Sequence, residues 1–598
     1  MASGRACSRE AKGGDQPRGQ AMDELFDNPE KREPKIPAAE HLRYHKTIGL
    51  AVSGDVKLTK LETDIIDTPG FQRLRWIQQL GSCSWIYPTA VHTRFDHSLG
   101  VLKMTDNMIA AINEGMAQVD PKPGISPPRF GVTDQQRILA RLYALLHDIT
   151  HVPFGHTLED ELKIFGSHDK LTGEDSSEGK SKFESLVGEG STIGNMIGDV
   201  LGDAMYKRLI DIILLGKTKR LEVMDEDGPR CDEFVYHLVS DTVCSDLLDY
   251  VERDSHFCNL GLSIHKRFMD YIYVSDVSLE GEQRRRVVVR LWKPRKGMPR
   301  FDVMTDLASL LDARYKLTER VYFHHSKITT AAMIGRAAQE ALYCGLLSAM
   351  QMLEFGDATF LDYLANIDTR TPFSRRKPFL DSVNAITKLA RAVLRRELYV
   401  RLKPYSKSNF DGDADEGCYD GLITDFASAN RRREVENALA KLARAKPGDV
   451  LVYVASPSMN KKIAQAWVDY GNRRTLLSEV PEPTLKARIE NIKDSHVRLW
   501  NAELLVHRDL TLAQRDLVRW GFESQYFPAR LAESAFLNLL TEVAAQDEKV
   551  GQLGQLTIRD ACRSAAVELA AGERVLGHGR EMWSLLQETL RTKLGLSR

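Results

Sequence analysis

The stretch ALLHDITHVPFGHTLED, residues 144–160, is the part of this sequence that decides its fold. It holds three histidines and three acidic residues, and an apolar run with helical spacing over 135–147 leads directly into it. Pro153 stops a helix from continuing far beyond this run, because proline lacks an N–H and clashes with the preceding turn. The sequence therefore predicts a buried helix whose end carries a cluster of ionisable side chains.

The pair His147 and Asp148 lies at the predicted end of that helix. Consecutive helical residues project about 100° apart, so both side chains can reach one ion beyond the helix end. The turn at Pro153 can bring His156 back over the same pocket. Six of the 16 histidines fall within residues 92–168, which is far more than even spacing would place there. Since imidazole and carboxylate bind divalent metals and move protons near neutral pH, we expect a metal site built on helix ends.

The composition is that of a globular protein with more than one domain. The chain has 598 residues, more than one hydrophobic core usually organises, and 43% of them are hydrophobic. The formal net charge of −1 indicates no general attraction to nucleic acid, and no apolar run reaches the ~20 residues needed to span a membrane. Eight cysteines without CxxC spacing favour reduced thiols, so we expect a cytoplasmic protein without a zinc ribbon.

Hydropathy patterns divide the chain into three predicted parts. Residues 1–37 are polar and Gly-rich and are predicted to form a disordered tail. Residues 38–435 form the predicted helical core, and residues 436–598 form a smaller α+β C-terminal lobe with a helical tail. The predicted fold class is therefore mainly α. Helical periodicity is found over 99–116, 135–147, 193–215, 231–252, 303–348 and 381–402.

Several shorter segments have patterns of their own. DTPGFQRLRWIQQLG, residues 67–81, is predicted to be a short amphipathic helix that ends at its final glycine. Residues 268–292 alternate β-branched and polar side chains around a glycine, which predicts a small β-hairpin insertion. In the C-terminal lobe, residues 449–457 are a predicted strand, and residues 483–508 are a predicted helix followed by a strand. Residues 166–182 are polar and are predicted to be a surface insertion.

Four motifs in a fixed order carry a family resemblance. They are DTPGFQRLRWIQQLG (67–81), HTRFDHSLG (92–100), LLHDITHVPFGH (145–156) and SDLLDYVERDSHFCNLGL (245–262). Through them, residues 47–335 resemble the HD-domain phosphohydrolases, and more narrowly the deoxynucleoside triphosphate triphosphohydrolase branch. The resemblance implies an HD-domain helical core and a metal-dependent phosphohydrolase.

The resemblance implies a divalent metal ion with four protein ligands. These ligands match His97, His147, Asp148 and Asp246, and Fe, Mn, Zn, Mg or Co would suit such donors. Independently of the family, residues 246, 249 and 250 share one face of a predicted helix. A buried carboxylate on that face would be costly without a cation, which agrees with a ligand role for Asp246.

The resemblance also implies catalytic residues beside the metal. A histidine matching His156 serves as general acid toward the leaving 5′-oxygen, and one matching His151 contacts the phosphates or assists catalysis. Arg94 suits phosphate because its planar guanidinium donates several hydrogen bonds and keeps its charge. The pair His168 and Asp169 would also line the pocket, although the family has His-Glu there at a different spacing.

Further positions match the substrate contacts of the family. They are Gln79 and Leu80 at the sugar, His92 in the pocket wall, Tyr250, Asp254 and Tyr322 around the deoxyribose, and Arg314 and Arg320 near the phosphates and base. A tyrosine that blocks the 2′-position and a carboxylate on the 3′-hydroxyl would together select deoxyribose. The chain departs from the animal enzyme where Leu247 replaces a lysine and Thr318 a histidine. Lys316, Lys327 or His325 would then have to supply the missing positive charge.

The implied reaction is metal-dependent hydrolysis of a deoxynucleoside triphosphate to a deoxynucleoside and triphosphate. Two alternatives remain open. The basic stretches 284–300 and 431–446 are compatible with an HD-type phosphodiesterase or nuclease acting on cyclic nucleotides, oligonucleotides or single-stranded nucleic acid. The C-terminal lobe is compatible with a non-hydrolytic nucleotide sensor. Family members commonly form homo-oligomers, so the resemblance implies a tetramer or hexamer. The lack of a long apolar run predicts no membrane partner.

Overall fold

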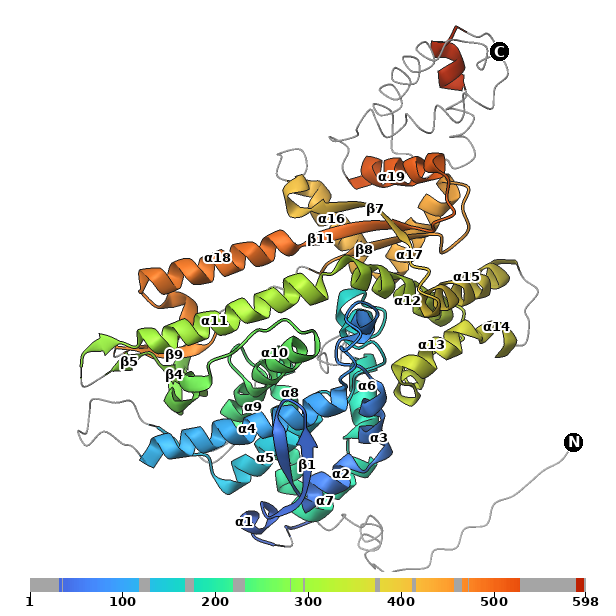
Figure 1. Ribbon diagram of the computed structural model, residues 1–598. Coiled ribbons are helices and arrows are strands. Elements are labelled where there is room, and N and C mark those ends of the chain that lie inside the picture. The colour runs from blue at the N-terminus through green and yellow to red at the C-terminus, as the bar shows by residue number, and fades with distance from the viewer. Residues whose placement is uncertain are drawn as a thin grey trace, which may run out of the picture.

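The protein is mainly α-helical with several small β-sheets, as the sequence predicts (Figure 1). The computed structural model describes residues 32–34, 36–117, 129–166, 177–218, 232–279, 281–293, 296–370, 377–410, 416–456, 465–471, 473–526 and 588–595. Most of the predicted tail lies outside these ranges, and the three-part domain division stays a prediction. None of the helices in these ranges combines the length and the apolar character that crossing a bilayer requires.

Three helices form the centre of the N-terminal half: α4 (Arg94–Ala117), α5 (Asp134–Leu146) and α10 (Ser245–Phe257). α4 packs against both of the others. α5 begins at Thr133, whose hydroxyl accepts the N–H of Gln136 while the Gln136 side chain accepts the N–H of Thr133. This reciprocal cap satisfies two N–H groups at the start of the helix, and so fixes where α5 begins.

The other elements of this half surround these three helices in Figure 1. They are α1 (Ala38–His41), β1 (Tyr44–Leu50), β2 (Gly54–Thr59), α2 (Lys60–Ile66), α3 (Pro69–Gln72), α6 (Ser177–Leu186), α7 (Thr192–Leu201), α8 (Asp203–Thr218) and α9 (Glu233–Val239). β1 and β2 form an antiparallel hairpin. Buried side chains from most of these elements join α4, α5 and α10 in one hydrophobic cluster, which we call the first core.

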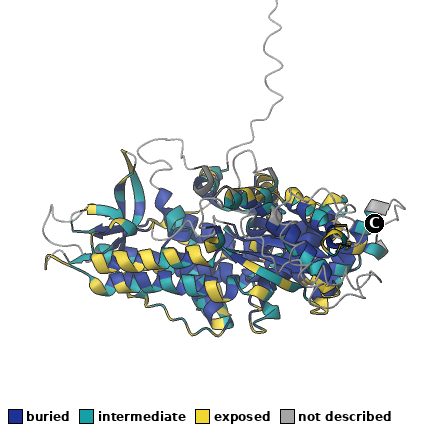
Figure 2. Ribbon diagram, turned by 90° about the horizontal axis from the view of Figure 1, so that it is seen from above, coloured by how far each residue is buried: buried dark blue, intermediate teal, exposed yellow. Residues whose placement is uncertain are grey.

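A second core lies in the C-terminal half. Its helices are α12 (His325–Tyr343), α13 (Asp357–Ala365), α14 (Ile367–Arg370), α15 (Lys377–Leu394), α16 (Glu416–Ala427), α17 (Ala429–Leu442) and α19 (Leu512–Tyr526). They pack around a three-stranded antiparallel sheet in the order β7 (Val400–Ser406), β11 (Asn501–Val506) and β8 (Val450–Val454). Figure 2 shows the buried residues in the interior and the exposed ones along outward helix faces. The apolar side chains of residues 152–165 belong to this second core, although the residues before them belong to the first.

A mixed sheet connects distant parts of the chain. The predicted hairpin is present as β3 (Ile272–Leu279) and β4 (Glu282–Arg290), and β4 pairs in parallel with β9 (Trp467–Tyr470). β10 (Arg473–Leu476) completes the order β10-β9-β4-β3. The long helices α11 (Phe301–Leu317) and α18 (Pro483–Leu499) run beside each other, and the short strands β5 (Trp292–Lys293) and β6 (Met298–Pro299) form a separate pair (Figure 1).

The structure differs from the sequence prediction in residues 67–81. The helix covers only α3 and a 3-10 turn at Arg73–Trp76, after which Gln78 forms an isolated β-bridge with Thr93. Gly81 has φ +53° and starts another 3-10 turn, so it does not end the helix. The predicted continuous helix was therefore wrong, because the bridge to the strand-like segment before α4 takes the chain out of helical geometry.

Other predicted helices are shorter than the hydropathy pattern suggested. The run 193–215 breaks at Gly202, which has φ +83°, and a π-turn at Thr318–Tyr322 interrupts the run 303–348. The run 381–402 ends as a helix at Leu394, and its last residues start β7. Pairing of β7 with β11, a strand a hundred residues away, determines that change, and no local pattern reports it.

Candidate active site

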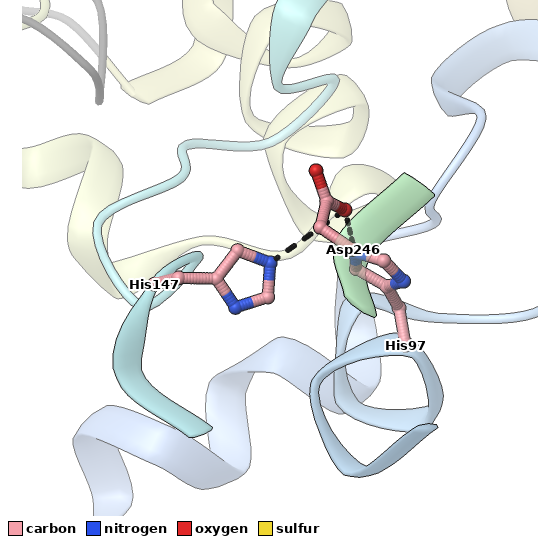
Figure 3. A group of neighbouring side chains, drawn as sticks. All are labelled: His97, His147 and Asp246. Carbon is pink, nitrogen blue, oxygen red and sulfur yellow. Dashed lines mark ion pairs between the residues drawn. The ribbon is translucent and has the colours of Figure 1, made fainter. Parts of the chain in front are cut away.

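Three predicted metal ligands meet at the ends of three helices. His97 lies in the first turn of α4, His147 directly follows α5, and Asp246 lies in the first turn of α10. Their ligand atoms all lie within 4.8 Å of one another. Asp246 Oδ1 is 3.0 Å from His97 Nε2 and 4.0 Å from His147 Nε2, and Figure 3 shows the three side chains pointing toward one another.

Asp148, the fourth predicted ligand, lies beside this group. Its Oδ1 is 3.5 Å from His147 Nε2, and its Oδ2 is 3.7 Å from His97 Nε2. The same carboxylate receives a hydrogen bond from Arg94 Nη1 at 2.6 Å. Burial alone would raise the pKa of Asp148, but the charges of His147 and Arg94 hold it well below its usual range. This carboxylate is therefore ionised near neutral pH.

The ring of His97 is oriented by a buried carboxylate on its far side. Its Nδ1 lies 2.9 Å from Asp249 Oδ2, which leaves Nε2 aimed at Asp246. Arg253 in turn donates two hydrogen bonds of 2.8 Å to Asp249. A Cβ on Gly100 would lie 2.0 Å from Asp249 Oδ1 and 2.2 Å from Arg253 Nη2, so only glycine leaves room for this pair. The close packing of Asp249 and Arg253 therefore explains why the HTRFDHSLG motif ends in glycine.

The ring of His147 is held by its own helix. Its Nδ1 lies 2.8 Å from the carbonyl oxygen of Ala144, so Nδ1 must carry a proton and donate it. Its Nε2 is buried and has no hydrogen-bond partner among the described residues. Burial lowers the pKa of His147, which favours the neutral imidazole that a metal requires. The lone pair of Nε2 is therefore available to a metal, and the hydrogen bond of Nδ1 fixes the ring, as is usual for a metal-binding histidine.

The charges of the group fit a divalent cation. Burial disfavours protonated His97, but the hydrogen bonds to Asp246 and Asp249 outweigh it and raise its pKa to about 10. Burial would likewise raise the pKa of Asp246, but His97 lowers it. Two ionised carboxylates and two imidazoles can neutralise a divalent ion once the His97 proton is displaced. His97, His147, Asp148 and Asp246 would hold this ion, and the donors alone do not select its identity.

A second group of predicted residues is also close to Asp148. His151 Nε2 is 3.3 Å from Asp148 Oδ1, and its Nδ1 is 2.7 Å from Glu159 Oε2. Lys182 Nζ lies 2.9 Å from the second oxygen of Glu159, and all three side chains of this chain of contacts are buried. His151 thus has a fixed orientation, and Arg94 lies next to it because both contact Asp148.

The predicted general acid, His156, lies at the surface of the same region. Its side chain is 52% exposed, and its Nδ1 is 2.6 Å from Asp160 Oδ2. The rings of His156 and His151 pack edge to face with centroids 4.8 Å apart. His156 is thus beside the buried cluster and accessible to solvent, as a residue that exchanges protons with a ligand must be.

Some of the residues predicted around the sugar form a separate polar group centred on Asp254. Asp254 Oδ1 is 2.8 Å from His92 Nε2, and its Oδ2 accepts a hydrogen bond of 2.8 Å from the Tyr322 hydroxyl. Both oxygens of Asp254 are therefore already hydrogen-bonded, and a substrate hydroxyl would have to share this carboxylate. Leu80 is buried nearby in the first core, while Gln79 is half-buried and its backbone N–H bonds to the carbonyl of His92.

The remaining predicted contacts are less tightly grouped. Tyr250 is half-buried, and burial raises its pKa while the nearby charge of Arg314 opposes the increase. Arg320 is exposed, and its carbonyl accepts a hydrogen bond from Tyr87. Leu247, which stands in place of a family lysine, is buried. His168 and Asp169 lie outside the described residues.

Two of the cations expected to replace the family lysine are engaged elsewhere. Lys327 is buried in an ion pair with Glu161, and Lys316 pairs with Asp312 at 2.6 Å. His325 stacks on His324, with ring centroids 4.5 Å apart. The prediction that Lys327 compensates is therefore not favoured by the structure, since leaving Glu161 unpaired in the interior would be costly.

Sequence reasoning missed the residues that hold this site in shape. Asp249 contacts His97, and Glu159 contacts His151. Arg253 and Lys182 pair with these two carboxylates, and none of the four was assigned a role. The i, i+4 spacing of Asp249 and Arg253 on α10 was visible, but their contact with α4 was not. Glu159 follows the HD motif closely, whereas its partner Lys182 is the last residue of the predicted surface insertion 166–182 and is buried, which its polar sequence context did not indicate.

Comparisons with known proteins find similarity over parts of this chain. Residues 94–225 match the HD domain family. The deoxynucleoside triphosphate triphosphohydrolase SAMHD1 homolog of Dictyostelium discoideum is 26% identical over 302 residues, which cover 50% of this chain and 49% of that protein. The deoxynucleoside triphosphate triphosphohydrolase SAMHD1 of Homo sapiens is 29% identical over 254 residues, covering 40% of this chain and 38% of that protein. A hypothetical protein from Aquifex aeolicus, known from a crystal structure, has a TM-score of 0.49 and 19% identity over 79% of this chain and 99% of that chain.

Residues 94–225 are thus similar to HD domains, and the predicted resemblance to the deoxynucleoside triphosphate triphosphohydrolase branch is confirmed. The matched region spans 49% and 38% of the lengths of the two named relatives. The HD match begins at Arg94 and includes three of the predicted metal ligands, His97, His147 and Asp148. The fourth, Asp246, lies on α10 beyond the end of the match.

Proposed function

We propose that this chain is a metal-dependent phosphohydrolase that converts a deoxynucleoside triphosphate to a deoxynucleoside and triphosphate. The observation that carries the proposal is the meeting of His97, His147 and Asp246 within 4.8 Å, from three separate helices, with Asp148 beside them. A pure structural role would not need a buried, unpartnered imidazole nitrogen at this point. The homology to triphosphohydrolases supports the choice of substrate class.

In the proposed mechanism, the metal ligands and the neighbouring side chains Arg94, His151 and His156 have separate roles. A divalent ion held by the four ligands would supply an activated water and polarise a phosphoryl oxygen. Arg94, fixed against Asp148, would donate hydrogen bonds to the phosphates and balance their negative charge. His151 is oriented by Glu159 to face the same space. His156, paired with Asp160, would deliver a proton to the leaving 5′-oxygen.

Selection of the sugar would depend on the group around Asp254. The Tyr322 hydroxyl and His92 already bind this carboxylate, so its position is fixed before a ligand arrives. We propose that the substrate 3′-hydroxyl joins this network and that Tyr250 and Tyr322 leave no room for a 2′-hydroxyl. Fixed polar partners discriminate strongly, because a ligand that lacks the matching group leaves them unpaired.

Asp148→Asn tests the proposal. The amide keeps the size of the side chain but removes the charge, so we expect loss of bound metal and of turnover while the circular dichroism spectrum is retained. Asp64→Asn, a change on α2 at a half-buried carboxylate that pairs with the exposed Lys60, is the matched control and should keep both. Normal turnover in the Asp148 variant would refute the site.

Chromatography of the products separates the alternatives. The protein would be incubated with each dNTP, with cyclic nucleotides and with single-stranded DNA, and its metal content measured. Triphosphate and deoxynucleoside support the proposal, nucleoside monophosphate indicates a phosphodiesterase or nuclease, and no turnover on any probe indicates a nucleotide sensor. The homo-oligomer and the cytoplasmic location remain predictions.

A further inference from the structure

One buried carboxylate connects two loops that lie far from it in the sequence. Asp357 is the first residue of α13 and is 6% exposed. Its Oδ2 accepts the backbone N–H of Gln78 at 2.9 Å, and its Oδ1 accepts the backbone N–H of Phe154 at 2.8 Å. The two partners are 279 and 203 residues away along the chain.

Both loops carry residues of the candidate active site. Gln78 directly precedes Gln79 and Leu80, which are predicted to meet the sugar. Phe154 lies between His151 and His156, which are predicted to act on the phosphates and the leaving oxygen. The carboxylate of Asp357 thus lies between the proposed sugar side and the proposed phosphate side without belonging to either.

The second of these loops has a strained backbone. Phe154 has φ +60° and Gly155 has φ +33°. A bulky residue with a positive φ is rare and persists only where surrounding contacts impose it. A Cβ on Gly155 would lie 3.0 Å from Arg94 Nη2 and 3.3 Å from His151 Nδ1, so this bend presses the backbone against both side chains. The N–H of Phe154 is held by Asp357 at the point of strain.

The start of α13 is pressed against the first loop. A Cβ on Gly356 would lie 2.4 Å from Trp76 Cβ and 2.7 Å from Trp76 O, so glycine permits the close approach. The two loops also meet, because the Cβ position of Gly81 lies 3.6 Å from the Phe154 carbonyl oxygen. α13 itself is anchored in the second core through the buried side chains of Phe360 and Leu361. The anchor of both loops is therefore a separate part of the fold.

The carboxylate is not used as an ion-pair partner. Among the described residues no cation forms a salt bridge with Asp357, and the charge of Arg94 acts on it only from a distance. Burial raises its pKa to about 6. A group whose ionised form is disfavoured by its surroundings is poorly suited to stabilise the fold at neutral pH. The ionised carboxylate provides two strong hydrogen-bond acceptors. Their donors are more than 200 residues away along the chain.

We propose that Asp357 is a positioning residue, whose carboxylate ties the loop of Gln79 and Leu80 to the loop of His151 and His156 and so sets their relative placement for the reaction. The role of these loops in turnover rests on the proposed function. The tie between them does not, since it is a property of the fold.

Two variants with a matched control test the tie. Asp357→Asn keeps the shape but can accept only one N–H with its single oxygen, and Asp357→Ala removes both acceptors. Asp362→Asn changes an exposed residue of the same helix and serves as control. Hydrogen exchange, read by mass spectrometry on peptides covering 77–81 and 152–156, measures the tie directly. Metal content, kcat and KM with a dNTP are measured on the same full-length preparations.

We expect faster exchange in both peptides together, and more so in the alanine variant, with metal content unchanged. We expect kcat to fall about tenfold in Asp357→Asn and about a hundredfold in Asp357→Ala, because displacing catalytic groups by about 1 Å has effects of this size. The circular dichroism spectrum and the exchange of peptides elsewhere in the chain should match those of wild type, which a general loss of structure would not allow. Unchanged exchange in either peptide would overturn the proposal, and so would faster exchange with full kcat. If wild-type protein turns over no probe, the proposed function fails, and the exchange data still decide whether Asp357 ties the loops.

Discussion

The two sides of the candidate active site are built in opposite ways. On the metal side, His97, His147 and Asp246 sit at helix ends of the first core, and each imidazole is aimed by a partner close by. On the loop side, residues 77–81 and 152–156 have irregular backbone, and their shared anchor comes from a helix of the second core. The backbone of the metal ligands is held by regular helical hydrogen bonds, whereas the irregular loops need a distant acceptor to satisfy and fix their N–H groups.

This difference has a consequence for mutation. A change on the metal side removes a ligand or its orientation, so it should act on metal binding first. A change on the loop side leaves the ligands untouched, so it should act on turnover first. Variants that separate metal content from kcat therefore test whether the two sides are independent.

The largest expected effect is that of His147→Ala. Removing this ligand takes away a donor whose second nitrogen is already fixed by Ala144, so we expect metal loss and a fall in turnover of about a thousandfold or more. Elemental analysis and product release measure the two effects. His45→Ala, at an exposed position of β1, is the control and should retain both. Full metal content in the His147 variant would show that the ligand set is misassigned.

Asp249→Asn should have the next largest effect. It leaves all four ligands in place but weakens the orientation of His97, so we expect metal affinity to fall about 10–100-fold, as for other residues that orient ligands. Titration with a competing chelator gives the affinity. Glu252→Gln, on the same helix α10, should leave the affinity unchanged. An effect confined to stability, with normal metal affinity, would contradict the role of Asp249.

Gly100→Ala tests the room around the Asp249–Arg253 pair. Alanine normally stabilises a helix, but a Cβ here would lie 2.0 Å from Asp249 Oδ1, so we expect a net loss of about 1–3 kcal/mol in the free energy of unfolding. Denaturant unfolding measures it. Gly115→Ala lies on the same helix, where the nearest described atom outside the helix to the new Cβ would be the carbonyl oxygen of Ile272 at 3.9 Å, and it should be neutral or stabilising. Equal stability of the two variants would show that the pair can move aside.

The smallest expected effect concerns the loop side and depends on pH. The pKa of Asp357 is raised from 3.8 to about 6 by burial, so the folded protein binds this proton at a higher pH than the unfolded chain does. Its favourable contribution is therefore complete below pH 4 and is lost as the pH rises from about 4 to about 6. We expect the melting temperature of wild type, minus that of Asp357→Asn, to decrease by a few degrees between pH 4.5 and about 7. A difference that does not change with pH would show that this carboxyl does not titrate in that range.

Much of the fold could be predicted because its signals are local. The periodicity of residues 135–147 predicts α5, and Pro153 predicts the turn that follows. The hairpin of β3 and β4, the strand β8 and the succession of α18 and β11 were also predicted from alternation and helical spacing. The periodicity predicts helix as far as residue 402, but the last three residues of that run begin β7, because pairing with β11 makes them a strand.

The sequence by itself determined the chemistry of the site: which histidines and carboxylates are available, and that His147 and Asp148 stand together at a helix end. The tertiary structure alone decided which side chains aim them. Asp249 reaches His97 only through the packing of α10 on α4, Lys182 reaches Glu159 across a polar segment, and Asp357 reaches two loops from another core. The physical reason is the difference in sequence separation between the two kinds of information. Side-chain type and helical spacing are read within a few residues, whereas a hydrogen bond between distant segments exists only after the hydrophobic cores have brought those segments together.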